Sequence, residues 1–169
     1  MQLINIDKKR YRQHLNIVIV GFIITLLALS LGIGQLLIAG FGLVGQSNFK
    51  YNLLGVVLAL LGCAAILHTV KKTIFFTEIY YVWQIKQIHN SIYRKLKKIK
   101  IAADNNEEQA LIILTFYYQT LQQVYQLDDN TLTINTVKKE LLKIEELIAN
   151  KNLTICAEQF EIKLLTSYS

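Results

Sequence analysis

The chain has 169 residues, a formal net charge of +6 at pH 7 and a hydrophobic content of 53%. This length fits one or two domains, and the apolar residues are concentrated in the first seventy positions. Proline is absent, which removes the strongest helix breaker and favours an all-α fold. The two cysteines are expected to be free thiols, because Cys63 lies in an apolar run and Cys156 in the charged half, which excludes a disulfide-stabilised fold.

Two long uncharged runs fill the N-terminal part of the chain. Positions 15–49 contain no Asp, Glu, Lys, Arg or His, and neither do positions 51–67, with Lys50 between the runs. A helix of about twenty residues crosses the hydrocarbon core of a bilayer. We therefore predict membrane spans at residues 17–39 and 53–70, joined by a loop rich in Gly, Ser and Asn.

Positive charge lies at the outer ends of these spans. Four basic residues precede the first span, Lys71 and Lys72 follow the second, and the loop carries Lys50 alone. The excess of Lys and Arg on cytoplasmic flanks predicts a hairpin with both termini in the cytoplasm. A cleaved signal peptide is the competing interpretation, but the apolar run is longer than a signal-peptide core and lacks a small-x-small cleavage site.

Small residues recur four positions apart within both spans. Such pairs let helix backbones approach closely, and the packing candidates are Ala28, Gly32, Gly55 and Ala59. They are expected either to close the hairpin on itself or to mediate dimerisation. The polar residues Gln35 and His68 are expected near the two membrane interfaces, and a role in transport is the alternative.

Residues 73–169 are predicted to form a cytoplasmic domain of three or four helices after the hairpin of residues 1–72. Apolar residues at spacings of three and four mark one helix face, namely Ile85, Ile88, Ile92, Leu96 and Ile99. No stop signal separates this helix from the second span, so we predict one continuous helix through to Ile101. The aromatic residues from Phe75 to Trp83 are expected either at the bilayer interface or in the domain core.

The remaining helices have recognisable boundaries. Asp104 with Glu107 three residues later resembles a capping box and predicts a helix at about 105–126. Asp128, Asp129 and Asn130 are expected to form a turn and a cap rather than a cation loop, because they lack the spacing of an EF-hand. Further helices are predicted at about 133–149 and 155–165.

Several stretches of the sequence resemble an uncharacterised family of small gammaproteobacterial inner-membrane proteins. The stretches that carry the resemblance are residues 7–16 (DKKRYRQHLN), 31–37 (LGIGQLL), 52–56 (NLLGV) and 126–131 (QLDDNT). The similarity covers most of the chain and implies a Gram-negative inner membrane. Because the family is a domain of unknown function, the resemblance transfers no activity and no site residues.

Charge is also asymmetric within the second half. Positions 71–100 hold eight Lys or Arg and one acid, whereas positions 101–169 hold ten acids and five Lys. The candidate interaction surface is the basic cluster of Arg94, Lys95, Lys97, Lys98 and Lys100. We expect this cluster to pair with the acidic helices. The alternatives are contact with lipid and binding of nucleic acid or an acidic protein. No recognition motif supports the binding of nucleic acid.

No nucleophile elbow, P-loop, dinucleotide fingerprint or metal-ligand spacing is present, so no cofactor, metal or small-molecule substrate is predicted. The leading hypothesis is a non-enzymatic inner-membrane adaptor or accessory subunit that docks a protein partner or a second copy. The alternative is a homo-oligomeric transporter or channel component lined by Thr25, Ser30 and Gln35. A membrane enzyme of unrecognised type is a third hypothesis.

Overall fold

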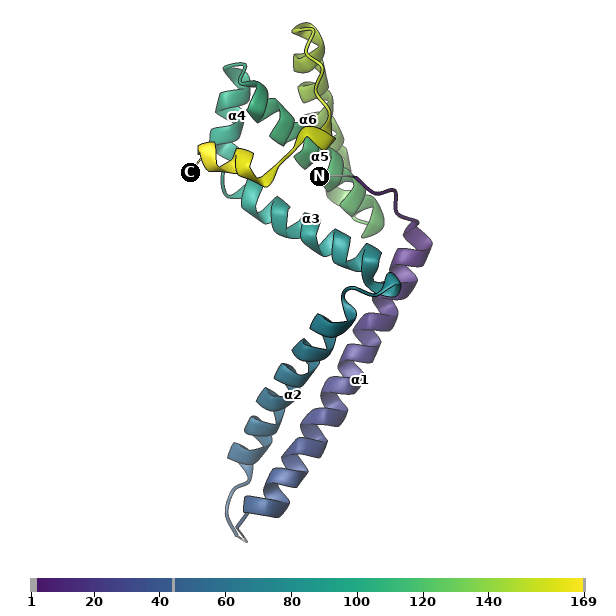
Figure 1. The fold of residues 1–169 in the computed structure, drawn as a ribbon, viewed down its shortest axis with the longest axis vertical. Coiled ribbons are helices and arrows are strands. Elements are labelled where there is room, and N and C mark those ends of the chain that lie inside the picture. Colours follow the sequence, from purple (N-terminus) through teal and green to yellow (C-terminus); the bar gives the residue numbers. More distant parts are fainter. Residues whose placement is uncertain (1–2, 44, 169) are drawn as a thin grey trace. The chain divides into compact units, whose positions relative to one another are not determined.

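The computed structural model describes residues 3–43 and 45–168, and these residues form helices and connecting turns without a strand. Figure 1 shows the α-helices in chain order, which are α1 (Lys8–Phe41), α2 (Phe49–Val70), α3 (Thr77–Tyr93), α4 (Leu96–Asp104), α5 (Glu108–Leu127) and α6 (Thr131–Asn150). Three 3₁₀ segments complete the described part, at Ile74–Phe76, Ala157–Gln159 and Ile162–Tyr168. The all-α class predicted from the sequence is confirmed.

The chain divides into two compact units, whose boundaries fall inside α1 and α3. Residues 13–79 form a helical hairpin, and residues 80–168 form a bundle together with the first residues of the chain, up to Arg12. Each unit is described separately below.

The hairpin consists of α1 and α2 running side by side (Figure 1). Both helices are long and apolar enough to cross a membrane, and the predicted spans at 17–39 and 53–70 lie within them. Most of their large apolar side chains are exposed. An exposed apolar surface of this extent is unfavourable in water and favourable in hydrocarbon.

Helices α1 and α2 of the hairpin come into backbone contact at Gly34 and Gly55. A Cβ atom built on Gly55 would lie 2.8 Å from the backbone nitrogen of Gly34 and 3.0 Å from the carbonyl oxygen of Ser30. Ala59, one turn further along α2, is fully buried. Ala28 and Gly32 take no part in this contact, because both are exposed and a Cβ on Gly32 would meet nothing within 4 Å.

The predicted continuous helix from the second span to Ile101 is wrong. Helix α2 ends at Val70, and Thr73 has extended backbone angles of φ −76° and ψ 155°. The Thr73 hydroxyl donates to the Val70 carbonyl at 2.8 Å, and the Thr73 N–H donates to the same oxygen at 2.9 Å. A threonine that binds the preceding turn in this way satisfies a terminal carbonyl and stops the helix without glycine or proline.

A second break divides the helix that follows. Lys95, with φ −110° and ψ 0°, separates α3 from α4, and its N–H donates to the Ile92 carbonyl at 2.9 Å. The predicted apolar stripe is nevertheless directed into the core, since Ile85, Ile88, Ile92 and Ile99 are buried. The stripe therefore belongs to two short helices that both pack on α5.

Helix α5 is the centre of the bundle. From Ala110 to Tyr118 every residue except Ile112 is buried, because α4, α6 and the C-terminal 3₁₀ segments all contact it. Phe116 stacks on Phe160 with ring centroids 4.0 Å apart. A helix covered on several sides in this way is apolar around most of its circumference.

Helix boundaries differ from the predictions by a few residues where tertiary contacts decide them. Asp104 ends α4 instead of capping α5, and Asn106 adopts a left-handed φ of 73°. The N–H groups of Asn106 and Glu107 donate back to carbonyls of α4, as in common helix C-terminal motifs. The helix predicted at 155–165 is replaced by the two C-terminal 3₁₀ segments.

Two buried threonines on α5 provide a matched pair for a stability test. Thr120 is hydrogen-bonded to His89 and to the Phe116 carbonyl, whereas the Thr115 hydroxyl has no hydrogen-bond partner among the described residues. We expect Thr120→Val to destabilise the bundle by about 1.5 kcal/mol, because it leaves a buried donor unpaired. Thr115→Val, which removes an unpaired buried hydroxyl, is expected to be neutral or stabilising. Urea unfolding of the full chain in detergent, followed by circular dichroism, measures both; equal losses would contradict the assigned hydrogen bonds.

Candidate functional site

Residues 3–7 have no regular secondary structure and contact the bundle. The N–H of Ile4 donates to the Tyr81 hydroxyl of α3 at 3.2 Å, and the Gln123 side-chain amide of α5 donates to the Ile4 carbonyl at 2.7 Å. Ile6 and Tyr11 are buried. Side chains from two helices therefore bind the main chain of this segment at Ile4.

An open groove of about 780 Å³ runs between this segment, the end of α5 and the start of α6. One wall presents the amides of Gln119, Gln123 and Gln126, whose spacing of four and three places them on one face of α5. Ile134 contributes apolar surface to the same groove. Thr131, three residues before Ile134 and on the same face of α6, also lines the groove and is exposed.

The turn between α5 and α6 is tied to two other elements by ion pairs. Asp129, in a left-handed conformation with φ 55°, pairs with Lys8 and Arg12 at the start of α1. Asp128 pairs with Lys86 of α3 at 2.7 Å. The turn predicted for Asp128 to Asn130 is present. The ion pairs were not predicted, although the basic stretch before the first span and this acidic turn have complementary charge.

The residues of the predicted basic cluster differ in their contacts. The Lys95 ammonium donates to the Leu165 carbonyl at 2.7 Å, and the Arg94 guanidinium donates to the Asn90 carbonyl of its own helix at 3.3 Å. Lys97 and Lys98 are exposed. Lys100 pairs with Glu140 of α6, as expected if basic residues face the acidic helices.

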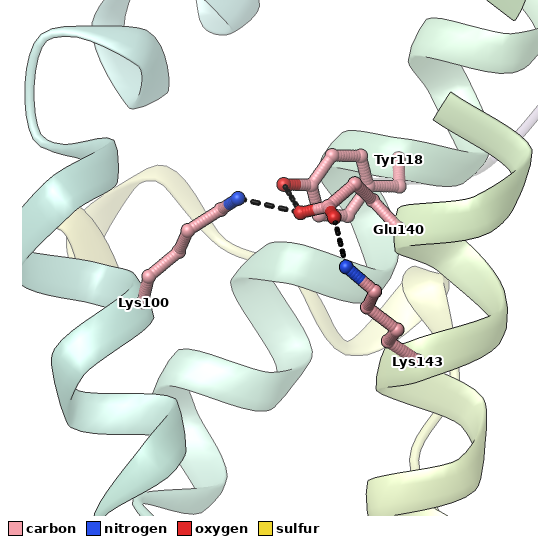
Figure 2. A network of polar contacts seen from close by, with 4 residues as sticks. All are labelled: Lys100, Tyr118, Glu140 and Lys143. Carbon is pink, nitrogen blue, oxygen red and sulfur yellow. Dashed lines mark hydrogen bonds and ion pairs between the residues drawn. The ribbon is translucent and has the colours of Figure 1, made fainter. Parts of the chain in front are cut away.

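Figure 2 shows the polar network around Glu140. The carboxylate accepts hydrogen bonds from Lys100 at 2.5 Å, Lys143 at 2.8 Å and the Tyr118 hydroxyl at 3.2 Å, and joins α4, α5 and α6. The hydrogen bonds from Lys100 and Lys143 lower the pKa of Glu140 to about 2. Burial alone would lower the pKa of Lys100, but its bonds to Glu140 and Tyr118 outweigh burial and raise it.

Replacing Glu140→Gln is expected to destabilise the bundle by about 1 kcal/mol, because the network loses its only carboxylate while Lys100 and Lys143 stay charged. The loss should shrink in 1 M NaCl, since salt screens partly exposed charges. The Glu140 contribution is also lost as the pH falls from 4.5 towards 2. The control is Glu161→Gln, which breaks an exposed pair with Lys163 and should change nothing measurable; urea midpoints at low and high salt make the comparison.

His89 of α3 is a buried titratable residue, with 7% of its surface exposed. Its Nε2 lies 2.7 Å from the Thr120 hydroxyl oxygen, and that hydroxyl donates to the Phe116 carbonyl at 2.6 Å. Nε2 therefore carries the proton and donates to Thr120. Burial, reinforced by the nearby Lys86 charge, lowers the pKa of His89 to about 4, so the ring is neutral at pH 7.

The aromatic residues near the end of the hairpin separate into two environments. In the hairpin unit, Phe75 stacks on His14 with ring centroids 4.1 Å apart. In the bundle unit, Tyr81 is buried, while Trp83 is 53% exposed and stacks on Tyr80. Within the predicted aromatic cluster, Tyr81 is therefore a core residue and Trp83 is a surface residue.

The polar residues proposed to line a channel have different environments in the single chain. The Ser30 hydroxyl donates to the Leu27 carbonyl of its own helix at 3.1 Å, and Gln35 is exposed. Thr25 lines a small apolar crevice between α1 and α2. A channel would need several copies of the chain, so the transporter hypothesis stays a prediction.

Fold and surface define an all-helical protein that combines a hairpin of two potential membrane spans with a helical bundle. The family model described as a protein of unknown function (DUF3087) matches residues 1–165, and the chain belongs to this family. No curated protein and no solved structure matches the chain.

Proposed function

We propose that this protein is a non-enzymatic adaptor of the bacterial inner membrane, with a hairpin that anchors it and a cytoplasmic bundle that docks a partner protein. Basic residues at the start of α1 and after α2 support an orientation with both termini in the cytoplasm. The exposed apolar side chains of the hairpin support its insertion into lipid.

The observation that carries the docking role is how the groove of the bundle holds a main chain. The N–H and C=O of Ile4 are bound by Tyr81 and Gln123, so this surface binds both backbone groups of one residue. Gln119 and Gln126 line the same groove. Amides offer both donors and acceptors, which suits peptide backbone. The occupant we propose is an extended segment of a partner protein that lies along these glutamines and covers Ile134.

Site-specific photocrosslinking in native membranes tests this role. A photoreactive residue at Thr131, which is exposed, lies in the groove, and one at Leu142 is an exposed control on the same helix. We expect a single protein to crosslink at position 131 and not at 142. We also expect Gln119→Ala with Gln126→Ala to reduce that product several-fold.

Two results would overturn the docking role. One is recovery of the chain without any crosslinked protein; the other is equal labelling from positions 131 and 142. A product formed only between copies of this chain would replace the partner by self-association.

A further inference from the structure

Another open cleft of the bundle, with a volume of about 400 Å³, lies between α3 and α5. Ligand pockets of roughly 300–1,000 Å³ are common in proteins, so this volume fits a small molecule. We call it the tyrosine cleft. Its wall combines aromatic, uncharged polar and apolar side chains, among them His89, Asn90 and Tyr93 from α3 and Tyr117, Val124 and Tyr125 from α5.

Two of the lining side chains are buried and keep a polar atom without a protein partner. Tyr117 is 6% exposed, and its hydroxyl has no hydrogen-bond partner among the described residues. His89 donates from Nε2 to Thr120, which leaves Nδ1 as an acceptor that no described residue binds. Buried polar atoms without a partner are rare and destabilising in folded proteins. Two such atoms on one cleft indicate a surface for a ligand.

Three tyrosine rings border the cleft. Burial raises the pKa of Tyr117 to about 12, and the nearby Tyr118, Tyr125 and Tyr93 reinforce this effect. The Tyr117 hydroxyl is therefore protonated at pH 7 and able to donate. Tyr93 and Tyr125 also lie close enough to Tyr117 to act on it electrostatically, so the rings gather around one space.

The cleft offers no unpaired charge to a ligand. Lys86 and Asp128 both line it, but they pair with each other at 2.7 Å. His89 is neutral at pH 7, because burial lowers its pKa to about 4. A charged ligand would lose hydration in the cleft without gaining a counter-ion of its own. The wall therefore favours an uncharged ligand.

We propose that the tyrosine cleft binds an uncharged aromatic ring that carries an N–H or O–H donor and an acceptor oxygen. The ring packs on the tyrosines, its donor binds Nδ1 of His89, and its oxygen accepts from the Tyr117 hydroxyl. Nucleobases and dihydroxybenzenes share this chemistry. A sugar fits less well because it has no aromatic face. The proposal does not rest on the membrane placement or on the docking groove.

Saturation-transfer NMR titrations of the full chain in detergent at pH 7.5 test the site. The probes are uridine for the nucleobases, resorcinol for the dihydroxybenzenes and glucose as a polar ring without aromatic character. We expect uridine, resorcinol or both to bind, which also tells the two sources apart. Glucose should give no signal above that of micelles without protein.

Two adjacent tyrosines give a matched pair of variants. Tyr117→Phe keeps the ring and removes a hydroxyl that holds no protein contact, so it should weaken binding about five-fold without lowering stability. Tyr118→Phe removes a hydroxyl that donates to Glu140 and lies outside the cleft lining. It should leave binding unchanged and lower stability slightly. Tyr93→Ala, at a side chain that is 69% exposed, keeps the core intact and should weaken binding about ten-fold.

The proposal is overturned if neither aromatic probe binds, or if glucose binds as well as they do. It is also overturned if Tyr117→Phe and Tyr118→Phe have the same affinity for the probe, or if Tyr93→Ala binds like the wild type. Because Tyr93 is at the surface, its variant decides the question even if a change at Tyr117 disturbs the bundle.

Discussion

Lowering the pH from 7.5 to 4.5 is expected to destabilise the helical bundle by about 2.5 kcal/mol through His89 alone. The ordinary pKa of histidine, about 6.5, applies in the unfolded chain, whereas burial lowers the pKa of His89 to about 4 in the folded bundle. Between these values the unfolded chain binds more protons. Stability is therefore complete above pH 6.5 and is lost as the pH falls towards 4.

The groups around His89 do not offset this loss. Lys86 disfavours a second positive charge, Asp128 is already paired with Lys86, and Tyr117 presents its ring edge-on to the imidazole. Thr120 accepts a hydrogen bond from Nε2 in either charge state and gives the cation no added partner. Protonation of His89 in the folded bundle therefore costs free energy.

Urea unfolding of the full chain in detergent at several pH values measures the effect, with circular dichroism as the probe. The control is His89→Gln, whose amide can still donate to Thr120 but does not titrate. The wild type should lose stability relative to this variant between pH 6.5 and 4.5. Parallel pH profiles for the two proteins would show that His89 is not buried as a neutral ring.

The sequence predicts the parts of the fold that depend on local hydrophobicity and on the spacing of apolar residues along a helix. A run of thirty-five residues without charge, from Leu15 to Phe49, predicts a long apolar helix, and α1 is long and apolar enough to cross a membrane. The spacing of Ile85, Ile88 and Ile92 likewise places one face in the core, and these residues are buried. Neither inference needs knowledge of a distant contact.

The helix breaks after α2 and α3 could not be predicted in this way. Thr73 and Lys95 are ordinary helix residues, and only the backbone hydrogen bonds to Val70 and Ile92 show that the helix stops there. The break at Lys95 divides the apolar stripe of Ile85 to Ile99, although the spacing of its apolar residues continues across the break. The local sequence therefore shows the helical period but not where one helix ends and the next begins.

The candidate groove also could not be predicted from local sequence patterns. It depends on the contact between Gln123 and Ile4, which are 119 positions apart. A glutamine on a helix and an apolar residue near the N-terminus have no individual signature. The weak clue is charge complementarity between Lys8, Arg12 and Asp129, which indicates a contact only once the helices are arranged.

Gly55→Ala is expected to destabilise the hairpin by about 2 kcal/mol, because the new methyl group would lie within about 3 Å of backbone atoms of Gly34 and Ser30. These atoms belong to helix α1 and cannot rotate away, so α1 and α2 must separate. Close approach of helix backbones is a main source of packing energy within lipid, where burial of apolar surface contributes little.

The matched control is Gly32→Ala, at a glycine whose added methyl group would meet nothing within 4 Å. Alanine is a better helix former than glycine, so this variant should be neutral or slightly stabilising. Thermal unfolding in detergent should lower the Tm of Gly55→Ala by roughly 5 °C and leave that of Gly32→Ala at or above the wild type. If both variants behave alike, the contact of Gly55 with Gly34 does not hold the hairpin together. If Gly32→Ala alone is destabilised, the outward face of α1 packs on another helix and the hairpin associates with a partner through it.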